Sequence, residues 1–304
     1  MYPILFKIGS LSISSFGLFL SLGLLFGTFI IWRLSKVYDL DPEKTLDLIF
    51  LTFFGGIIGG RLYYVLFHLS EFKNLTRIFL INRYPGLSFW GGFFIGFLIL
   101  NYLTKRQKLN FWLVADLAAV GFFAGLSLGS LGCLLGSCQY GVTSNLPFAV
   151  TQIGVIGGRL PVQFGYFILF LLALIFLWRM CLRFHFTGKV ASVALILLGL
   201  IKFPLDFYRG DEPKVLGNFN EGHFFAVFSA LLGIVIYYRQ SKKSFITDLK
   251  FLAYFFINSK VRNTTLSKFN KTWYNLKVNF RISYLNFKKQ LFKKLNVKSN
   301  PNQF

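Results

Sequence analysis

Charged residues are scarce in this chain of 304 residues, at 14% of the total, and acidic ones are scarcest, with 11 Asp or Glu against 33 Lys or Arg. Hydrophobic residues make up 55%. So little polar surface cannot wrap a soluble core, which excludes an ordinary globular protein in water. The composition indicates an integral membrane protein.

Cysteine and histidine are also rare, with three residues of each. Three cysteines are too few for a disulfide framework, and their spacings do not match a zinc site. We therefore expect no metal and no cofactor. Cys133 and Cys138 are five residues apart, which puts them on different faces of a helix, so we interpret them as small packing residues.

Long apolar runs dominate most of the sequence. A bilayer-spanning helix needs about 20 mostly apolar residues. Seven stretches meet or approach this length: 11–32, 48–69, 87–103, 111–135, 162–178, 190–208 and 224–238. The first is longer than a signal-peptide core and follows a single basic residue, Lys7, so we expect it to be retained. These runs predict an all-α, polytopic membrane protein of about seven transmembrane helices.

The loops between the runs alternate in charge. Positively charged loops stay on the cytoplasmic side of a membrane. Lys and Arg gather after the first, third, fifth and seventh runs, as in Arg33, Lys36, Lys44, Lys105, Arg106, Lys108, Arg179, Arg183 and Lys189. This pattern predicts an N-terminus outside and a C-terminus in the cytoplasm.

Glycines at four-residue spacing let helices approach closely in lipid. They occur at Gly55/Gly59, Gly56/Gly60, Gly121/Gly125/Gly129 and Gly132/Gly136. We expect the second and fourth spans, which carry them, to be central in the bundle.

The end of the chain differs in composition from the rest. From Arg239 onward there are fifteen Lys or Arg residues and one acid, Asp248, so this part carries +14 of the net charge of +22. We divide the chain into a seven-helix membrane domain at 1–240 and a basic, aromatic-rich cytoplasmic tail at 241–304. The tail, an amphipathic helix or a disordered segment, suits an anionic membrane surface better than a nucleic acid.

Ionisable residues inside the apolar runs are functional candidates, because charge at membrane depth is costly unless it meets a partner or water. The simplest interpretation pairs Arg61 with Asp116, and Lys202 with Asp206 four residues later. A functional interpretation adds Arg209, one turn beyond Asp206. Lys202, Asp206 and Arg209 would then form a cationic patch suited to a phospholipid phosphate.

Five stretches, in this order, resemble a known family. They are 59–67 (GGRLYYVLF), 86–92 (GLSFWGG), 129–141 (GSLGCLLGSCQYG), 159–163 (RLPVQ) and 202–209 (KFPLDFYR). With Asp116, they resemble prolipoprotein diacylglyceryl transferase, the bacterial membrane enzyme that attaches a lipid to the lipobox cysteine of lipoprotein precursors. Seven spans in the predicted orientation match the family's topology, and the resemblance implies the bacterial cytoplasmic (inner) membrane.

The resemblance implies transfer of a diacylglyceryl group from phosphatidylglycerol to the cysteine thiol of prolipoprotein signal peptides. Cations must then stabilise the departing glycerol phosphate, and the thiol must be ionised. The catalytic residues implied are Asp116, Lys202, Asp206 and Arg209. The substrate-binding residues implied are Arg61, Arg159, Gln163, Gly132 and Gly141.

Several signature positions differ from the family. Trp90, Ser130 and Cys133 stand where the family has His, Arg and Asn; Cys138, Leu160 and Lys202 stand where it has an acid, His and Arg. We expect Trp90 to be an interfacial tryptophan.

The sequence therefore does not identify the group that accepts the proton of the substrate thiol. His68 or His223, near outer helix ends, could replace the missing histidine, although a lone histidine there is more often an interfacial polar residue. A strongly cationic pocket could also ionise the thiol without a base.

Two alternatives follow from these differences. A catalytically silent relative would bind phospholipid or lipoprotein precursor without transferring anything. An unrelated transporter or flippase would line a pathway with the intramembrane charges, but no inverted repeat is visible in the sequence.

Overall fold

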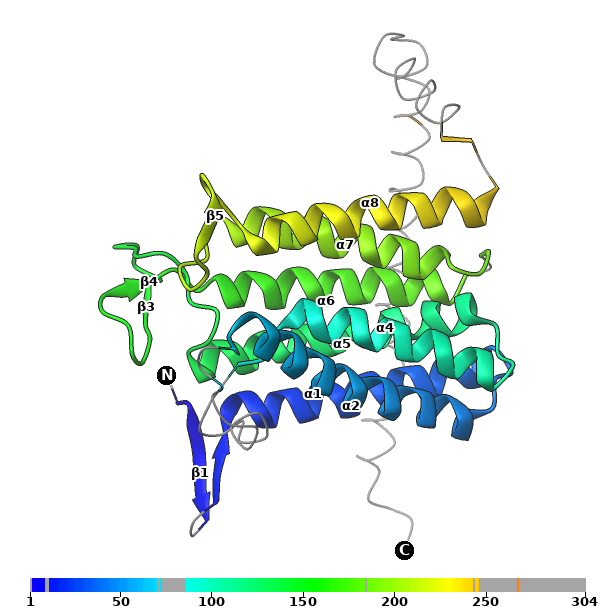
Figure 1. Cartoon of the computed structure of the whole chain (residues 1–304), viewed down its shortest axis with the longest axis horizontal. Coiled ribbons are helices and arrows are strands. Elements are labelled where there is room, and N and C mark those ends of the chain that lie inside the picture. The colour runs from blue at the N-terminus through cyan, green and yellow to red at the C-terminus, as the bar shows by residue number, and fades with distance from the viewer. Residues whose placement is uncertain are drawn as a thin grey trace, which may run out of the picture. The chain divides into compact units, whose positions relative to one another are not determined.

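The computed structural model describes residues 2–8, 11–69, 72, 86–183, 185–242, 244, 245 and 267. The chain divides into two compact units, Met1–Lys242 and Lys243–Phe304. The first is a helical bundle (Figure 1). Apart from residues 241, 242, 244, 245 and 267, the predicted basic tail lies outside the described residues, so its role stays a prediction, as does the domain boundary at 240.

Seven helices occur in the described part of the chain, one for each predicted apolar run. They are α1 (Ser15–Val37), α2 (Pro42–Phe67), α4 (Phe89–Arg106), α5 (Phe111–Gly136), α6 (Val162–Cys181), α7 (Lys189–Asp206) and α8 (Glu221–Ser241). Five of them, α1, α2, α5, α6 and α8, are long and apolar enough to cross a membrane. The all-α, polytopic fold class is confirmed, while the orientation of the termini stays a prediction.

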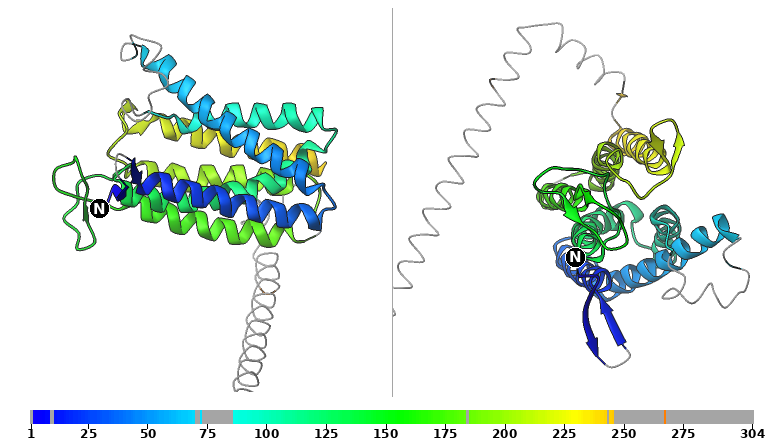
Figure 2. Two further views of the ribbon diagram at one scale, coloured as in Figure 1. Left: turned by 90° about the horizontal axis from the view of Figure 1, so that it is seen from below. Right: turned by 90° about the vertical axis from the view of Figure 1, so that its left-hand side faces the viewer.

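The helices alternate in direction, so the ends of α2, α5 and α7 lie with the starts of α1, α4, α6 and α8 (Figures 1 and 2). Within the described residues, three two-stranded hairpins mark this end: β1 (Ile4–Ile8) with β2 (Leu11–Ser14), β3 (Val150–Thr151) with β4 (Gly158–Arg159), and β5 (Lys214–Leu216) with β6 (Phe219–Asn220). We call it the hairpin end. All the predicted site residues except Asp116 lie in the halves of their elements toward this end.

The first helix begins four residues later than predicted, because 11–14 forms β2. Its sequence Leu-Ser-Ile-Ser alternates apolar and polar residues, which is the period of a strand. Ser14 then caps α1, since its hydroxyl oxygen accepts a hydrogen bond from the Gly17 N–H at 3.1 Å. Asp41, Ser88, Asn110 and Asn220 cap other helices in the same way.

Glycine contacts join the helices in pairs, as the spacing predicted. A Cβ added to Gly27 of α1 would lie 2.7 Å from the Gly121 carbonyl of α5. A Cβ added to Gly60 of α2 would lie 2.8 Å from the Ser88 carbonyl at the start of α4. Only glycine allows these backbones to approach so closely.

The main hydrophobic core surrounds α5 and includes residues of α1, α6 and α7. Half of the membrane-length part of α5 is buried, which agrees with its predicted central place. The same prediction for α2 is wrong, because only 28% of its span is buried. Figure 2 (left) shows α2 crossing the bundle at an angle, and its apolar face is open at Phe54, Ile58 and Leu62.

Candidate functional site

Three predicted site residues meet at the end of α7. The Lys202 Nζ lies 3.6 Å from Asp206 Oδ1, and an Arg209 terminal nitrogen lies 3.6 Å from the same oxygen. All three side chains are at least nine-tenths buried. The helical period brings Lys202 and Asp206 together, because positions i and i+4 share one face, and the turn after α7 adds Arg209. The predicted Lys202–Asp206 ion pair is confirmed.

Aromatic side chains from two other helices complete this group. The hydroxyl of Tyr166, on α6, donates a hydrogen bond to Asp206 Oδ1. The Lys202 ammonium lies 5.2 Å from the Tyr166 ring centroid and 5.4 Å from that of Phe89, on α4. Cation–π contacts of this kind partly replace the water that a buried ammonium loses. Tyr166 was not predicted as a site residue, although its hydroxyl within an apolar run could have indicated a buried polar contact.

Two further carboxylates bind Arg209 from the turn after α7. Arg209 donates two hydrogen bonds to Asp211, at 2.7 and 3.0 Å, and its Nη1 lies 2.6 Å from Glu212 Oε1. Burial raises the pKa of the Glu212 carboxyl, although Arg209 opposes the shift. With Asp206, three carboxylates surround two cations here. The prediction of a cationic patch is therefore wrong, because the acidic turn folds back on Arg209.

A short extended segment joins the two arginine-bearing loops. Gly141 pairs with Arg209 in one antiparallel bridge, and Thr143 pairs with Arg159 in another. Backbone hydrogen bonds of 2.8 to 3.0 Å support both junctions. A Cβ at Gly141 would lie 2.2 Å from the Leu160 carbonyl oxygen, so only glycine fits at this position.

Arg159 and Gln163 lie beside this segment. The Arg159 guanidinium is 5.4 Å from the Tyr140 ring centroid, and its NH2 donates to the Ile156 carbonyl at 3.3 Å. Gln163, at the start of α6, is fully buried, and its Nε2 donates to the Cys138 carbonyl at 2.7 Å. The structure thus brings Gly141, Arg159, Gln163 and the α7 cluster to one end of the bundle.

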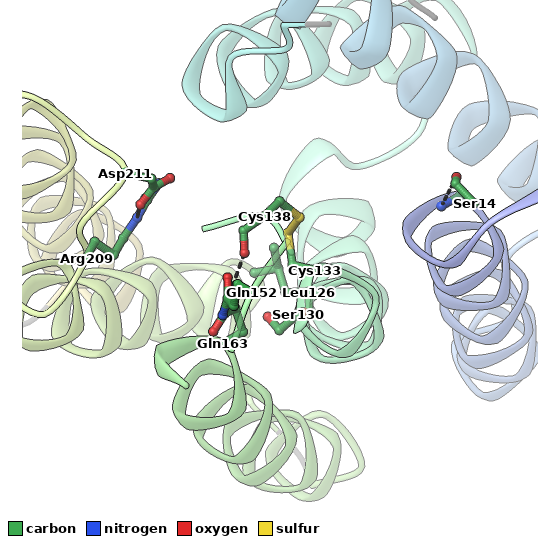
Figure 3. Close-up of a disulfide and its surroundings, with 10 residues drawn as sticks. Ser14, Leu126, Ser130, Cys133, Cys138, Gln152, Gln163, Arg209 and Asp211 are labelled. Carbon is green, nitrogen blue, oxygen red and sulfur yellow. Dashed lines mark hydrogen bonds and ion pairs between the residues drawn. A yellow bond between two sulfur atoms is a disulfide. The ribbon is translucent and has the colours of Figure 1, made fainter. Parts of the chain in front are cut away.

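Cys133 and Cys138 form a disulfide at the end of α5 (Figure 3). Their interpretation as separate packing residues on different helix faces is wrong. The helix ends at Gly136, and Ser137, with φ 62°, turns the chain back, so the two Cα atoms lie 4.8 Å apart. Gly132 behaves as a packing glycine, since its Cβ would lie 2.7 Å from the Phe19 side chain.

Arg61 is buried near the end of α2, at 5% exposure. Its Nη1 donates a hydrogen bond to the Gly86 carbonyl at 2.8 Å, and its guanidinium lies 4.9 Å from the Phe72 ring centroid. A second contact ties this part of α2 to α8, where the Tyr63 hydroxyl donates to Glu221 at 3.3 Å. Arg61 therefore faces protein rather than lipid.

Asp116 lies near the opposite end of the bundle, in the second turn of α5. It accepts hydrogen bonds from the backbone N–H groups of Gly188 and Ala191, both at 2.7 Å, and lies 3.5 Å from His185 Nε2. The predicted Arg61–Asp116 pair is therefore wrong. Asp116 instead caps the start of α7, and its hydrogen bond is the main cause of a raised pKa at His185, against the effect of burial.

Trp90 is only 6% exposed and stacks on Phe225 of α8 with ring centroids 4.8 Å apart. Its interpretation as an interfacial tryptophan is wrong, because α4 directs it into the bundle. It joins α4 to α8 through aromatic contacts.

The two histidines at the hairpin end differ in their hydrogen bonds. His223 is buried among Phe203, Phe207 and Phe219, and its Nδ1 contacts both the Asn220 N–H, at 3.2 Å, and Asn220 Oδ1, at 2.5 Å. His68 Nδ1 lies 3.0 Å from the Tyr64 carbonyl, which only accepts, so Nδ1 carries the proton there and Nε2 carries the lone pair in the neutral ring. Among the described residues, no three His, Cys, Asp or Glu side chains could hold a metal ion.

The fold and the site define a polytopic membrane protein with charged residues buried at one end of its bundle. The sequence model of the prolipoprotein diacylglyceryl transferase family matches residues 3–239. The chain belongs to this family.

Several individual relatives agree with the family match, and each is named phosphatidylglycerol–prolipoprotein diacylglyceryl transferase. The relative from Mannheimia succiniciproducens is 30% identical over 255 residues, which cover 78% of this chain and 93% of the relative. The one from Streptococcus pneumoniae serotype 4 is 30% identical over 250 residues, covering 79% and 95%. The one from Finegoldia magna is 26% identical over 253 residues, covering 82% and 100%.

Proposed function

We propose that this membrane protein transfers the diacylglyceryl group of phosphatidylglycerol to the cysteine thiol of prolipoproteins. Membership of the transferase family over nearly the whole bundle carries this conclusion. We place the protein in the bacterial cytoplasmic membrane with its hairpin end outside, because the basic loops join the helices at the other end. The lipobox cysteine would then meet the site on the outer side.

The lipid phosphate, in this proposal, binds Arg209 and Lys202. Asp211 and Glu212 now present carboxylate oxygens to Arg209 at 2.6 to 3.0 Å. Phosphate oxygens make the same charge-assisted bonds to a guanidinium, so the phosphate can replace these carboxylates. The acidic turn then neutralises Arg209 when no lipid is bound, because an unpaired buried guanidinium is costly.

Asp206 and Tyr166 have a positioning role in this scheme. Asp206 lies within 3.6 Å of a nitrogen of both cations, and Tyr166 holds the carboxylate from the neighbouring helix. Cations fixed in this way need no rearrangement as charge develops on the departing group.

The reaction balances without a further reactant. The cysteine thiolate attacks the glycerol carbon, a C–S bond forms, and the C–O bond to phosphate breaks. The electron pair of that bond leaves with glycerol phosphate, where Lys202 and Arg209 stabilise it, and the proton of the thiol passes to a base.

We propose His68 as that base. Its protonated Nδ1 faces the Tyr64 carbonyl, which leaves the Nε2 lone pair available. His185 pairs with Asp116 at the opposite end, and His223 is only 1% exposed among aromatic side chains, out of reach of a substrate thiol. Arg61 lies toward the same end of α2 that His68 caps, which suits our proposal that it binds substrate.

The remaining predicted residues act, in this proposal, through the loops. Arg159 supplies a further cation for the substrate, while Gln163, Gly132 and Gly141 keep the loops in place. Asp116 acts at a distance by holding the start of α7, the helix that carries Lys202 and Asp206 at its other end.

A complementation experiment tests the function. A transferase-depleted bacterium expresses this chain, and mass spectrometry measures thioether-linked diacylglycerol on a lipoprotein. We expect lipidation with the wild type and with Lys214→Gln, an exposed lysine at the same end that contacts Asn218. Arg209→Gln should abolish it. Absence of lipidation with well-expressed wild-type protein would overturn the proposal.

A further inference from the structure

The disulfide lies at two positions where this chain departs from the family signature. Cys133 is in the last turns of α5 and is 5% exposed. Beyond the left-handed Ser137, the Cys138 N–H donates to the Cys133 carbonyl at 3.0 Å. The covalent bond therefore fixes the first residue after the turn against the helix that precedes it.

Cys138 in turn holds the start of α6. Its carbonyl accepts the 2.7 Å hydrogen bond from Gln163 Nε2, and Gln163 also lies 3.4 Å from Gln152 Oε1 (Figure 3). Both glutamines are at least nine-tenths buried. If the Cys138 carbonyl moved, the buried Gln163 amide would lose this hydrogen bond, and water could not readily replace it. An unpaired buried donor is costly, so the position of this carbonyl is important.

Two residues later the chain enters the segment 140–143, which we call the junction segment. It pairs with Arg209 through Gly141 and with Arg159 through Thr143. On one side the Val142 N–H donates to the Tyr208 carbonyl at 2.9 Å, and on the other the Val142 carbonyl accepts from the Leu160 N–H at 3.0 Å. The backbones of both arginines therefore depend on where the junction segment lies.

We propose that the Cys133–Cys138 disulfide is a positioning element of the transferase site, which fixes the junction segment and thereby both arginines. This inference rests on the proposed function. Its consequence is that phosphatidylglycerol binding depends on the oxidised state of this pair.

The redox chemistry is simple. An oxidised dithiol protein of the extracytoplasmic side would form the bond by thiol–disulfide exchange, taking two electrons and two protons from the two thiols. A water-soluble phosphine reverses it in vitro: the phosphine takes up oxygen from water as phosphine oxide, the S–S bond breaks, and each sulfur gains a proton. The substrate thiol is unchanged by such a reductant.

The test uses the full chain in lipid nanodiscs containing phosphatidylglycerol, with a synthetic lipobox peptide as acceptor. Transfer is measured over a range of phosphine concentrations, and alkylation with mass spectrometry counts the free thiols. A displacement of about 1 Å at binding groups reduces the rate by about 100-fold. We therefore expect kcat/KM for phosphatidylglycerol to fall by about that factor as the disulfide is reduced and Cys133 and Cys138 become available for alkylation. Most of the change should be in KM for the lipid, since the arginines bind it.

Two variants complete the experiment. Cys133→Ser/Cys138→Ser should have the reduced activity at all phosphine concentrations. Cys181→Ser, which removes a buried thiol outside the disulfide, should behave as wild type. The unfolding midpoint of each variant, and of the reduced wild type, shows whether a loss of activity comes from unfolding; we expect the reduced wild type to stay folded.

Full activity of the reduced, alkylated wild type would overturn the inference and leave the proposed function intact. So would two free thiols at these positions in protein isolated without reductant. Failure of the oxidised wild type to transfer any lipid would instead contradict the proposed function.

Discussion

Gly141 lies where the two arginine-bearing loops meet, so Gly141→Ala tests whether the junction segment sets the site. The added Cβ would lie 2.2 Å from the Leu160 carbonyl oxygen and 2.8 Å from Val162 Cγ2. Relieving the first contact requires a shift of about 1 Å, because well-packed proteins have no spare volume here. The bridge between Gly141 and Arg209 would move with it.

The cost in activity should exceed the cost in stability. Overpacking of this kind destabilises by about 1–3 kcal/mol. A displacement of about 1 Å at binding groups reduces the rate by about 100-fold. We therefore expect a folded Gly141→Ala protein with kcat/KM about 100-fold below wild type, measured as lipid transfer to a lipobox peptide in nanodiscs.

Gly129→Ala is the matched control, because a Cβ at Gly129 meets nothing within 4 Å. It lies within α5, where alanine favours the helix by about 0.5–1 kcal/mol over glycine. Its activity should equal that of wild type. Equal activities of Gly141→Ala and Gly129→Ala would refute the argument that the junction segment positions the arginines.

Three further predictions concern titratable side chains. Asp206→Asn should remove most transfer activity and lower the unfolding midpoint, because Lys202 and Arg209 lose a shared buried carboxylate. The free energy of unfolding should fall by about 3–5 kcal/mol. His185 has a raised pKa in the folded state, so its stabilising effect is complete at pH below its ordinary value of about 6.5 and is lost as the pH rises through the raised value; the unfolding midpoint should fall over that range. His68→Gln should lower kcat, because the substrate thiol loses its proton acceptor, with little change in KM for the lipid.

Each of these has a result that would contradict it. Asp211→Asn controls for Asp206→Asn, because it also removes a carboxylate from Arg209 but at a side chain that is 21% exposed. Equal losses would argue against a special role for Asp206. For His185, the same fall of the unfolding midpoint with pH in His185→Gln would show that another group is responsible. An unchanged kcat in His68→Gln would assign the thiol proton to another acceptor.

The sequence by itself determined the helices and one part of the site. Each apolar run became a helix, because in lipid a spanning segment must satisfy its own backbone hydrogen bonds. The helical period was enough to bring Lys202 and Asp206 together, although Arg209 joins them only through the turn after α7, and glycine spacing identified helices that approach closely. These features depend on residues that are near one another along the chain.

Tertiary structure decided what depends on chain reversals and on neighbouring helices. The turn at Ser137 brought two cysteines into a disulfide that helical spacing had separated, and the turn after α7 placed two carboxylates on Arg209. Asp116 found its partners at the start of α7 rather than at Arg61. Periodicity along one helix carries no information about such contacts, because they depend on where the backbone leaves the helix and on which segment it then meets.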